Sequence, residues 1–151
     1  MIYIAHRGNL NGPNPNDENK PDYIINAIRK GFYVETDLWI IYDELFLGHD
    51  CPQYKIDIEF LLNVKDFLFC HCKNIEALHF IIKNYPEIEC FFHVNDECVL
   101  TSKQHIWNYP GSLLTNMSIC VMPETSSQKV STDCYAVCTD YPIRIQNTTL
   151  C

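Results

Sequence analysis

The sequence predicts an α/β fold, in which a mainly parallel β-sheet carries short helices in its connections. Short apolar runs alternate with stretches of helical periodicity or with brief connections. Polar side chains that can do chemistry follow several of these runs, as they do at the carboxyl ends of parallel strands. The chain has 151 residues, 47% of them hydrophobic. We therefore expect one globular domain over residues 1–151 with a sizeable core.

The first half of the chain contains a predicted strand, loop, helix and hairpin. An apolar run ends at His6, and a loop rich in Asn, Pro and Gly follows. Asp22 is expected to cap an amphipathic helix that Gly31 ends. Asp43 and Glu44 turn a β-rich stretch back on itself. The expected elements are a strand at 2–5, a loop at 9–21, a helix at 22–30, strands at 32–41 and 45–47, and a helix at 57–65.

The second half of the chain contains further strands and one clear helix. The expected elements are strands at 67–72, 90–94, 99–101, 118–122 and 135–139, and a helix at 74–84. This pattern places His71, His93 and Asp140 at or near the carboxyl ends of strands. Parallel α/β folds bind their ligands at that edge of the sheet.

Composition and charge exclude several classes of protein. The formal net charge of -8 and the pI of about 5.1 argue against nucleic-acid binding, because duplex phosphates would be repelled. No run of about 18 apolar residues occurs, so no integral membrane segment is expected. The N-terminus lacks signal-peptide features, and the nine cysteines are odd in number, with several inside apolar runs. We therefore expect a cytoplasmic protein without a disulfide framework.

Glu35 and Asp37 are candidate metal ligands. Two residues apart on a strand, their side chains share one face of the sheet. Two carboxylates this close repel one another unless a cation lies between them, and a hard divalent ion with oxygen ligands fits that place. Taken alone, the pair is better explained as two solvated carboxylates on an edge strand. The apolar flanks and the neighbouring histidine motifs favour the metal.

His6 and His49 are candidate proton-transfer groups. His6 follows the first strand and precedes Arg7 and Gly8. An imidazole transfers protons near neutral pH, a guanidinium offers a planar fork to a phosphate, and glycine permits a tight turn. His49, followed by Asp50, ends the returning arm of the hairpin, which brings it back toward the carboxylate pair. Two histidines on opposite sides of a phosphate can act as base and acid.

Four further candidates lie at or just after the ends of later strands. Side-chain alternation points His71 away from its two cysteine neighbours, where it could complete a metal site. Lys73 could pair with a phosphate oxygen, or it could be a solvated lysine at a strand end. His93 could line the pocket or pack in the core. Glu124, after an apolar run, is a weaker candidate.

The ordered set of motifs resembles the glycerophosphodiester phosphodiesterase family, over about residues 3–142. The matching motifs are His6-Arg7-Gly8, Glu18-Asn19, Glu35-Thr36-Asp37, His49-Asp50 and Thr139-Asp140-Tyr141-Pro142. The resemblance implies a (β/α)8 barrel with the active site at the carboxyl ends of its strands. The residues it implies are His6 and His49 for acid–base catalysis, Glu35 and Asp37 for Mg²⁺ or Ca²⁺, Arg7 and Lys73 for the phosphate, and Glu18 as a support that acts through Arg7.

Two features depart from the family pattern. His71-Cys72-Lys73 stands where the family has Glu-x-Lys, so we expect His71 as the third ligand, with Mg²⁺ as the metal and Mn²⁺ or Ca²⁺ as alternatives. A (β/α)8 barrel typically needs about 250 residues, and this chain has 151. We therefore expect a shortened barrel, in which residues 95–117 replace one βα unit and several helices are absent. A second copy of the chain, in a homodimer, would cover the exposed edge.

The leading expectation for function is a metal-dependent hydrolase of a small-molecule phosphodiester, either glycerophosphodiester-like or sugar-linked. One alternative is a lyase that stops at a cyclic phosphate, in the manner of phosphatidylinositol-specific phospholipases C. Another alternative is a phosphate-binding module without turnover. The missing third carboxylate favours the module. Retention of His6 and His49 favours an enzyme, because binding alone has no use for two proton-transfer groups.

Overall fold

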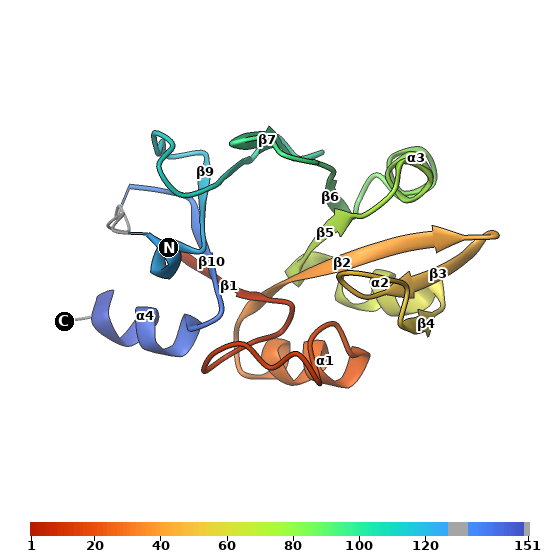
Figure 1. Cartoon of the computed structure of the whole chain (residues 1–151), viewed down its shortest axis with the longest axis horizontal. Coiled ribbons are helices and arrows are strands. Elements are labelled where there is room, and N and C mark those ends of the chain that lie inside the picture. Colours follow the sequence, from red (N-terminus) through yellow and green to blue (C-terminus); the bar gives the residue numbers. More distant parts are fainter. Residues whose placement is uncertain (127–132, 150–151) are drawn as a thin grey trace.

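The computed structural model describes residues 1–126 and 133–149, which form one mixed ten-stranded sheet with helices on its outer side (Figure 1). The strands are β1 (Ile2–His6), β2 (Tyr33–Ile41), β3 (Glu44–Leu47), β4 (Tyr54–Ile56), β5 (Leu68–Cys72), β6 (Glu89–Phe91), β7 (Cys98–Leu100), β8 (Ile106–Asn108), β9 (Ser118–Val121) and β10 (Ala136–Thr139). The α-helices of the described residues are α1 (Pro21–Arg29), α2 (Ile58–Val64), α3 (Ile75–Asn84) and α4 (Pro142–Thr149), and short 3-10 turns lie at Lys65–Phe67 and Pro123–Thr125.

Seven of the strands run parallel, in the order β6-β5-β2-β1-β10-β9-β8. Strand β3 pairs antiparallel with the C-terminal half of β2, and β4 pairs antiparallel with β3. At the other end of the sheet, β7 pairs antiparallel with β8. The predicted hairpin over 32–47 is confirmed, with Tyr42 and Asp43 at positive φ in its tight turn. The strands β4 and β8 and the helix α4 were not predicted from the sequence, because each is short and its hydrophobic periodicity is weak.

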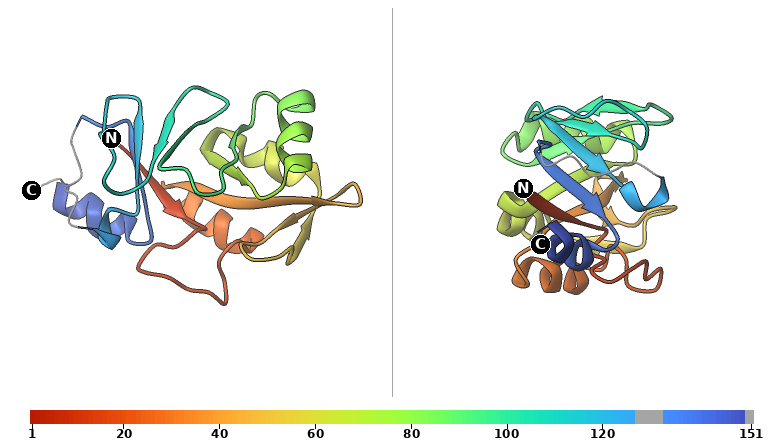
Figure 2. Two further views of the ribbon diagram at one scale, coloured as in Figure 1. Left: turned by 45° about the horizontal axis from the view of Figure 1, so that its top comes forward. Right: turned by 90° about the vertical axis from the view of Figure 1, so that its left-hand side faces the viewer.

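Alternation along the strands creates two apolar layers, one inside the curl of the sheet and one beneath the helices. Phe69 on β5 and Trp107 on β8 belong to strands that are not neighbours, yet their ring centroids are 6.2 Å apart. The sheet therefore curls far enough for its inner face to pack on itself (Figure 2). The outward side chains Val34, Cys70 and Cys72 pack instead in the larger cluster with the helices.

The predicted shortened (β/α)8 barrel is wrong: the described residues form a mixed sheet curled into a half-barrel. After β6, the described chain carries no α-helix until α4, so strands and helices do not alternate. The two edges of the curl approach at the turn after β7, where the Ser102 N–H donates to the Cys90 carbonyl at 2.8 Å. No ladder joins β6 to β7 or β8 among the described strands. With 151 residues, the chain is too short to supply a helix after every strand.

The helices α1, α2 and α3 lie close to the positions predicted from the sequence, but the predicted N-cap of α1 is wrong. α1 begins at Pro21, a residue suited to a first turn because it has no N–H to satisfy. The predicted cap Asp22 lies inside that first turn, and Lys20 occupies the N-cap position without a side-chain hydrogen bond. At α3, the side chain of Asn74 accepts from the Ala77 N–H, a genuine N-cap.

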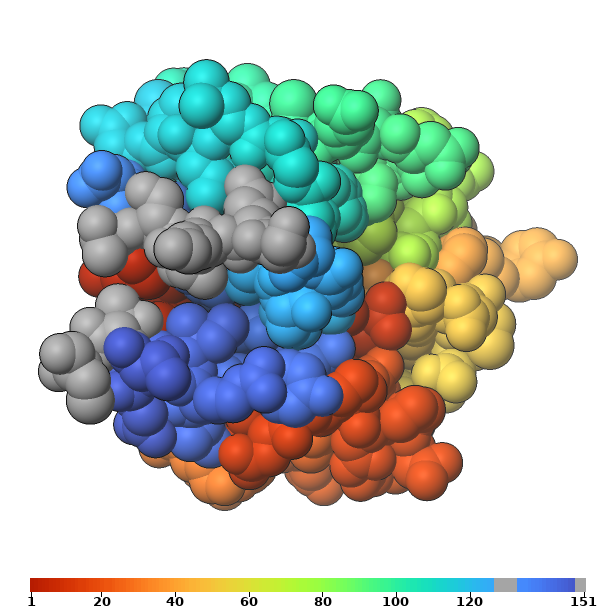
Figure 3. Space-filling model, turned by 60° about the vertical axis from the view of Figure 1, so that its left-hand side comes forward, coloured from red at the N-terminus to blue at the C-terminus, as the bar shows by residue number. Residues whose placement is uncertain are grey.

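The N-terminal loop and the C-terminal segment lie side by side (Figure 3). The Gly12 N–H donates to the Asp140 carbonyl at 2.8 Å, which joins the loop after β1 to the end of β10. Six of the eight cysteines in the described part of the chain are buried, as expected of thiols that pack in a core. Among the described helices, none has the length and apolar character needed to span a bilayer.

Candidate active site

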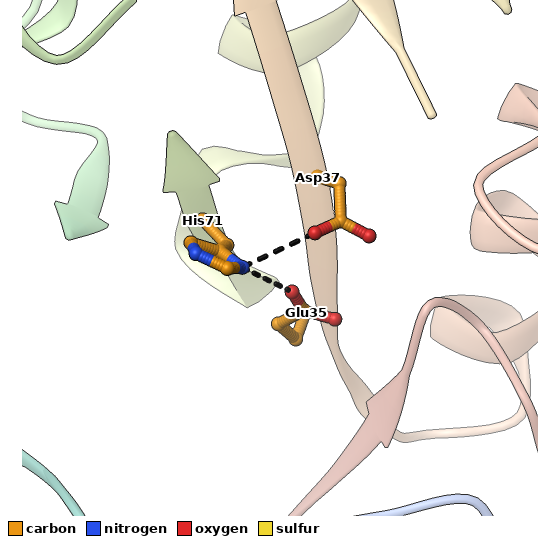
Figure 4. Close-up of side chains that lie close together, drawn as sticks. All are labelled: Glu35, Asp37 and His71. Carbon is orange, nitrogen blue, oxygen red and sulfur yellow. Dashed lines mark ion pairs between the residues drawn. The ribbon is translucent and has the colours of Figure 1, made fainter. Parts of the chain in front are cut away.

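The structure brings Glu35, Asp37 and His71 together on the inner face of the sheet (Figure 4). Glu35 and Asp37 share a face of β2, and the register of β5 sets His71 directly beside Asp37. His71 Nδ1 lies 3.1 Å from Asp37 Oδ1 and 3.8 Å from Glu35 Oε1. One ligand atom from each of the three residues lies within 4.8 Å of the others. That spacing allows a single ion to touch all three.

The two carboxylates differ in their electrostatic surroundings. Burial raises the pKa of Asp37, but His71 and the cations Lys73 and Arg7 outweigh it, so the net pKa lies well below the ordinary value. Burial and the nearby charge of Asp37 raise the pKa of Glu35. Lys73 Nζ lies 3.4 Å from Asp37 Oδ1, and Arg7 Nε lies 3.2 Å from Asp37 Oδ2. Asp37 is therefore held by two cationic side chains in direct ion pairs, whereas Glu35 interacts with the Arg7 guanidinium only as a more distant charge.

The donor set fits a divalent cation. Asp37 Oδ1 is buried and has no well-aligned hydrogen-bond donor in the structure, although His71 and Lys73 approach it as ion pairs. This region holds more carboxylates than cationic side chains. With neutral imidazoles and ionised carboxylates, the excess is two negative charges. The carboxylates are those of Glu18, Glu35, Asp37 and Asp140, and the cations are Arg7 and Lys73. Two carboxylates and an imidazole suit Mg²⁺ or Mn²⁺ better than Ca²⁺, which prefers an all-oxygen cage.

Asn19 fixes the orientation of Asp37. Its side-chain carbonyl accepts from the Asp37 N–H at 2.9 Å and from the Thr36 hydroxyl at 2.8 Å. Its amide nitrogen donates to Asp37 Oδ2 at 2.9 Å. Asn19 adopts a positive φ of 63°, a conformation that asparagine tolerates better than most residues. Asn19 of the Glu18-Asn19 motif therefore positions a candidate metal ligand. This role of Asn19 was not predicted from the sequence.

Arg7 is held among carboxylates at the end of β1. Its Nη1 donates to Glu18 Oε2 at 3.1 Å, and its backbone N–H donates to Glu35 Oε2 at 3.2 Å. Burial lowers the pKa of Arg7, but Glu35 and Asp37 outweigh it and raise the net pKa. Glu18 also accepts from Asn9 at 2.8 Å. Two of the three guanidinium nitrogens of Arg7 thus face carboxylates, so Arg7 has limited capacity left for a substrate phosphate.

His6 is oriented by Asp140. His6 Nδ1 lies 2.8 Å from Asp140 Oδ1, which also accepts from Asn9 at 2.8 Å, and His6 Nε2 lies 3.9 Å from Glu35 Oε2. Burial lowers the pKa of His6, but the hydrogen bond with Asp140 and the charge of Glu35 raise it to a net value above the ordinary one. His6 and Asp140 are 134 positions apart in the chain, so only the parallel pairing of β1 with β10 brings them together.

Glu124 supports Asp140 from the 3-10 turn that follows β9. Its Oε1 accepts from the Asp140 N–H at 2.9 Å and from the Thr139 hydroxyl at 2.7 Å. Its Oε2 is buried and has no hydrogen-bond partner in the structure. Glu124, a weaker candidate in the sequence, thus contacts Asp140, which in turn contacts His6. It can act on His6 by holding Asp140 in place.

His49, Lys73 and His93 complete the wall of the site. His49 follows β3, is 39% exposed, and places Nδ1 2.7 Å from Asp50 Oδ1. The imidazole of His93 stacks on that of His71, with ring centroids 4.5 Å apart, and its Nε2 makes a hydrogen bond with the Tyr109 hydroxyl. Burial and the neighbouring His71 lower the pKa of His93 to about 4. His93 is therefore neutral near pH 7 and serves as part of the wall.

Two cavities border the site. One, of about 360 Å³, is lined by seven of the nine predicted site residues: His6, Arg7, Glu35, His49, His71, Lys73 and His93. The other, of about 480 Å³, is lined by the eighth, Glu18, and it shares His6, Arg7 and His49 with the first. The ninth, Asp37, is fully buried beside His71. The predicted residues thus gather at one end of the curled sheet.

The loop that carries His49 depends on Gly48, and Gly48→Ala is expected to lower the free energy of unfolding by about 1–3 kcal/mol. Gly48 has a φ of +147°, and an added Cβ would lie 2.2 Å from the Cys51 carbonyl oxygen. Gly31→Ala is the matched control, because Gly31 also has a positive φ but its Cβ would meet nothing within 4 Å. Urea unfolding of both variants measures the difference. Equal losses in the two variants would contradict the clash at Gly48.

No family model matches the chain, and neither the curated proteins nor the solved structures contain a significant match to it.

Proposed function

We propose that this protein is a phosphoric diester hydrolase that acts on a small-molecule phosphodiester with a divalent metal ion and a pair of histidines. The observation that carries the proposal is that Glu35 and His71 of the candidate triad line the same cavity as His6, with Asp37 buried beside His71 and His6 Nε2 3.9 Å from Glu35 Oε2. A metal-ligand set beside an oriented imidazole suits phosphoryl transfer. Glycerophosphodiester-like or sugar-linked diesters are the proposed substrates.

Each residue of the site has a distinct role in this proposal. Glu35, Asp37 and His71 would hold the ion, preferably Mg²⁺ or Mn²⁺, which when bound supplies positive charge against the charge developing on the phosphoryl oxygens. Lys73, next to Asp37, adds a second positive charge at the same wall. Arg7 mainly holds the carboxylates in place, because its guanidinium is already engaged by Glu18 and Asp37.

Proton transfer falls to the two histidines that border both cavities. Asp140 accepts the Nδ1 proton of His6, which leaves the Nε2 lone pair directed into the site. His6 is therefore assigned as the base that takes the proton of a hydroxyl on the substrate's own alcohol as that oxygen attacks phosphorus, and water then opens the cyclic phosphate to complete the hydrolysis. His49, which lines both cavities and is partly exposed, is assigned as the acid that protonates the leaving alkoxide.

The test is release of product from bis-p-nitrophenyl phosphate and from glycerophosphodiesters, first with EDTA and then with Mg²⁺, Mn²⁺ or Ca²⁺ restored. The expected result is turnover that EDTA abolishes and that Mg²⁺ or Mn²⁺ restores. Accumulation of a cyclic phosphate, observed by phosphorus NMR, would identify a lyase instead. Absence of turnover with every metal, together with measurable phosphate binding, would replace the enzyme with a binding module.

His71→Ala is expected to weaken metal binding by at least tenfold. Loss of a residue that merely supports a ligand typically costs about 10–100-fold in metal affinity, so loss of a direct ligand should cost at least as much. Calorimetric titration with Mn²⁺ measures the affinity. His93→Ala is the control, since His93 stacks on His71 but lies outside the triad. An unchanged affinity in His71→Ala would remove His71 from the ligand set.

A further inference from the structure

The basic side chains of the cavity of about 360 Å³ are already engaged by carboxylates. Arg7 pairs with Glu18 at 3.1 Å and with Asp37 at 3.2 Å. Lys73 Nζ lies 3.4 Å from the same carboxylate, that of Asp37. A phosphoryl group in this cavity would therefore gain most from a hydrogen-bond donor that has no acceptor within the protein.

Tyr109 follows β8 directly and lines the same cavity. Its hydroxyl makes a hydrogen bond with Nε2 of His93, whose ring stacks on that of His71 with centroids 4.5 Å apart. The rings of His93 and Tyr109 meet edge to face, with centroids 4.9 Å apart, and the Tyr109 N–H donates to the Glu97 carbonyl at 2.9 Å. These contacts fix the Tyr109 hydroxyl close to a candidate metal ligand.

The hydrogen bond between His93 and Tyr109 could run in either direction, because each group can donate or accept. The other ring nitrogen of His93, Nδ1, is buried and has no hydrogen-bond partner among the described residues. A proton on Nδ1 would be a buried N–H without an acceptor, which folded proteins tolerate less well than a lone pair without a donor. The ring proton is therefore assigned to Nε2, which donates to the Tyr109 oxygen.

As the acceptor in that bond, Tyr109 keeps its own hydroxyl proton for another partner. Among the described residues, no side chain or carbonyl other than His93 is placed to accept it. Burial raises the pKa of Tyr109 and outweighs the hydrogen bond with the Trp107 side chain, which lowers it, so the hydroxyl stays protonated. Because an indole N–H can only donate, Trp107 does not take up this proton either.

We propose that the Tyr109 hydroxyl donates a hydrogen bond to a non-bridging phosphoryl oxygen of the substrate, and that His93 is the residue that positions it. A fixed donor at an oxygen that gains negative charge lowers the barrier to phosphoryl transfer. This inference rests on the proposed phosphodiesterase function. It adds a catalytic residue from the β8 side of the curl to a site whose ion-binding residues come from β2 and β5.

The test uses 2-hydroxyethyl p-nitrophenyl phosphate, a diester with its own hydroxyl near phosphorus, and its two phosphorothioate isomers. In each isomer sulfur replaces one of the two non-bridging oxygens. With Mg²⁺ present, we expect Tyr109→Phe to lower kcat for the oxygen diester about tenfold or more. Sulfur is a weak hydrogen-bond acceptor, so the isomer with sulfur toward Tyr109 should be slowed in the wild-type protein and no longer slowed in Tyr109→Phe. The other isomer should be slowed equally in both proteins.

Tyr135→Phe is the matched control. Tyr135 is also a partly buried tyrosine that stacks on a histidine, His105, with ring centroids 3.9 Å apart, but it lines neither cavity of the site. Tyr135→Phe should change neither kcat nor the ratio of the two isomers. Circular dichroism of each sample reports its fold.

A second pair of variants allows for loss of folding in Tyr109→Phe, which leaves the His93 N–H without an acceptor. His93→Phe keeps the Tyr109 hydroxyl and should retain the isomer preference in weakened form. Tyr109→Phe combined with His93→Phe removes both polar groups and should lose the preference. An equal preference in these two variants would contradict the role of the hydroxyl.

Calorimetric titration with inorganic phosphate in Mg²⁺ separates this inference from the proposed function. Turnover with the same isomer preference in the wild-type protein and in Tyr109→Phe would overturn the role of Tyr109 and leave the phosphodiesterase. No turnover by the wild-type protein, with phosphate binding that Tyr109→Phe weakens about fivefold or more, would overturn the enzyme and keep Tyr109 as a phosphate-binding donor. No turnover and equal phosphate binding would overturn both.

Discussion

Replacing His6 with alanine is expected to lower the turnover number about 10²–10⁴-fold, the usual contribution of a general acid or base. His6 is held by Asp140 at 2.8 Å with its other nitrogen directed toward Glu35. The fold should survive, because Asp140 keeps its hydrogen bonds from Asn9 and Asp140 N keeps its bond to Glu124. Steady-state kinetics on bis-p-nitrophenyl phosphate, with circular dichroism of the same sample, measure both effects.

The matched control for His6→Ala is His79→Ala, the same substitution on the exposed side of α3. His79→Ala should retain full activity. A further variant, Glu124→Gln, weakens the support of Asp140, which orients His6. The pH dependence of turnover should therefore shift in this variant while the KM stays constant. A merely structural role of Glu124 would not shift the pH dependence. Full activity in His6→Ala would contradict the assignment of His6 as the base.

Asp37→Asn and Glu35→Gln are expected to change stability in opposite ways, although both should abolish metal binding. Asp37 is paired with Arg7 Nε at 3.2 Å and with Lys73 Nζ at 3.4 Å. Its neutralisation takes a carboxylate partner from both half-buried cations and leaves Arg7 with Glu18 alone, and breaking a buried ion pair typically costs about 3–5 kcal/mol. The Glu35 side chain contacts only imidazoles, at 3.8–3.9 Å, and the Arg7 backbone N–H. Its raised pKa marks a carboxylate that is costly to ionise, so Glu35→Gln should be neutral or stabilising without metal.

Urea unfolding in EDTA measures this contrast, and repetition with saturating Mg²⁺ shows how much stability the ion adds. The wild-type protein should gain stability from Mg²⁺, whereas neither variant should. Glu44→Gln is the control, since it removes one carboxylate from an exposed ion pair with Lys55 and should cost about 1 kcal/mol or less. Equal destabilisation by Asp37→Asn and Glu35→Gln would refute the different roles of the two carboxylates.

Much of the candidate site follows from strand periodicity alone. A period of two sets Glu35 and Asp37 on one face of β2 and turns His71 away from Cys70 and Cys72, and the structure shows both arrangements. The expected hairpin likewise returns His49 to the border of both cavities. These features depend on local geometry, which the order of residues along a single strand or turn fixes.

The supporting network was beyond the reach of sequence patterns. Asn9 carries no distinctive signal, because asparagine is common in any loop of this composition, and Asn19 was noted only as part of the Glu18-Asn19 motif, without a role of its own. Their role arises when the loop after β1 folds over the end of the sheet, where Asn9 donates to Glu18 and Asp140, and Asn19 encloses Asp37. The strand β8 was also missed, since three residues of strand are too few for a period to show.

The sequence by itself determined which chemical groups follow which strands: the carboxylate pair, the imidazoles at strand ends and the glycines that allow tight turns. Only the tertiary structure decided that β2 lies between β1 and β5, which sets His71 beside Asp37 and His6 beside Glu35. It also decided that the sheet curls into a half-barrel with mixed strand directions, against the predicted barrel. The reason is physical: strand neighbours and closure depend on the sum of long-range packing energies and on the chain length left for connections, and neither is encoded in a local pattern.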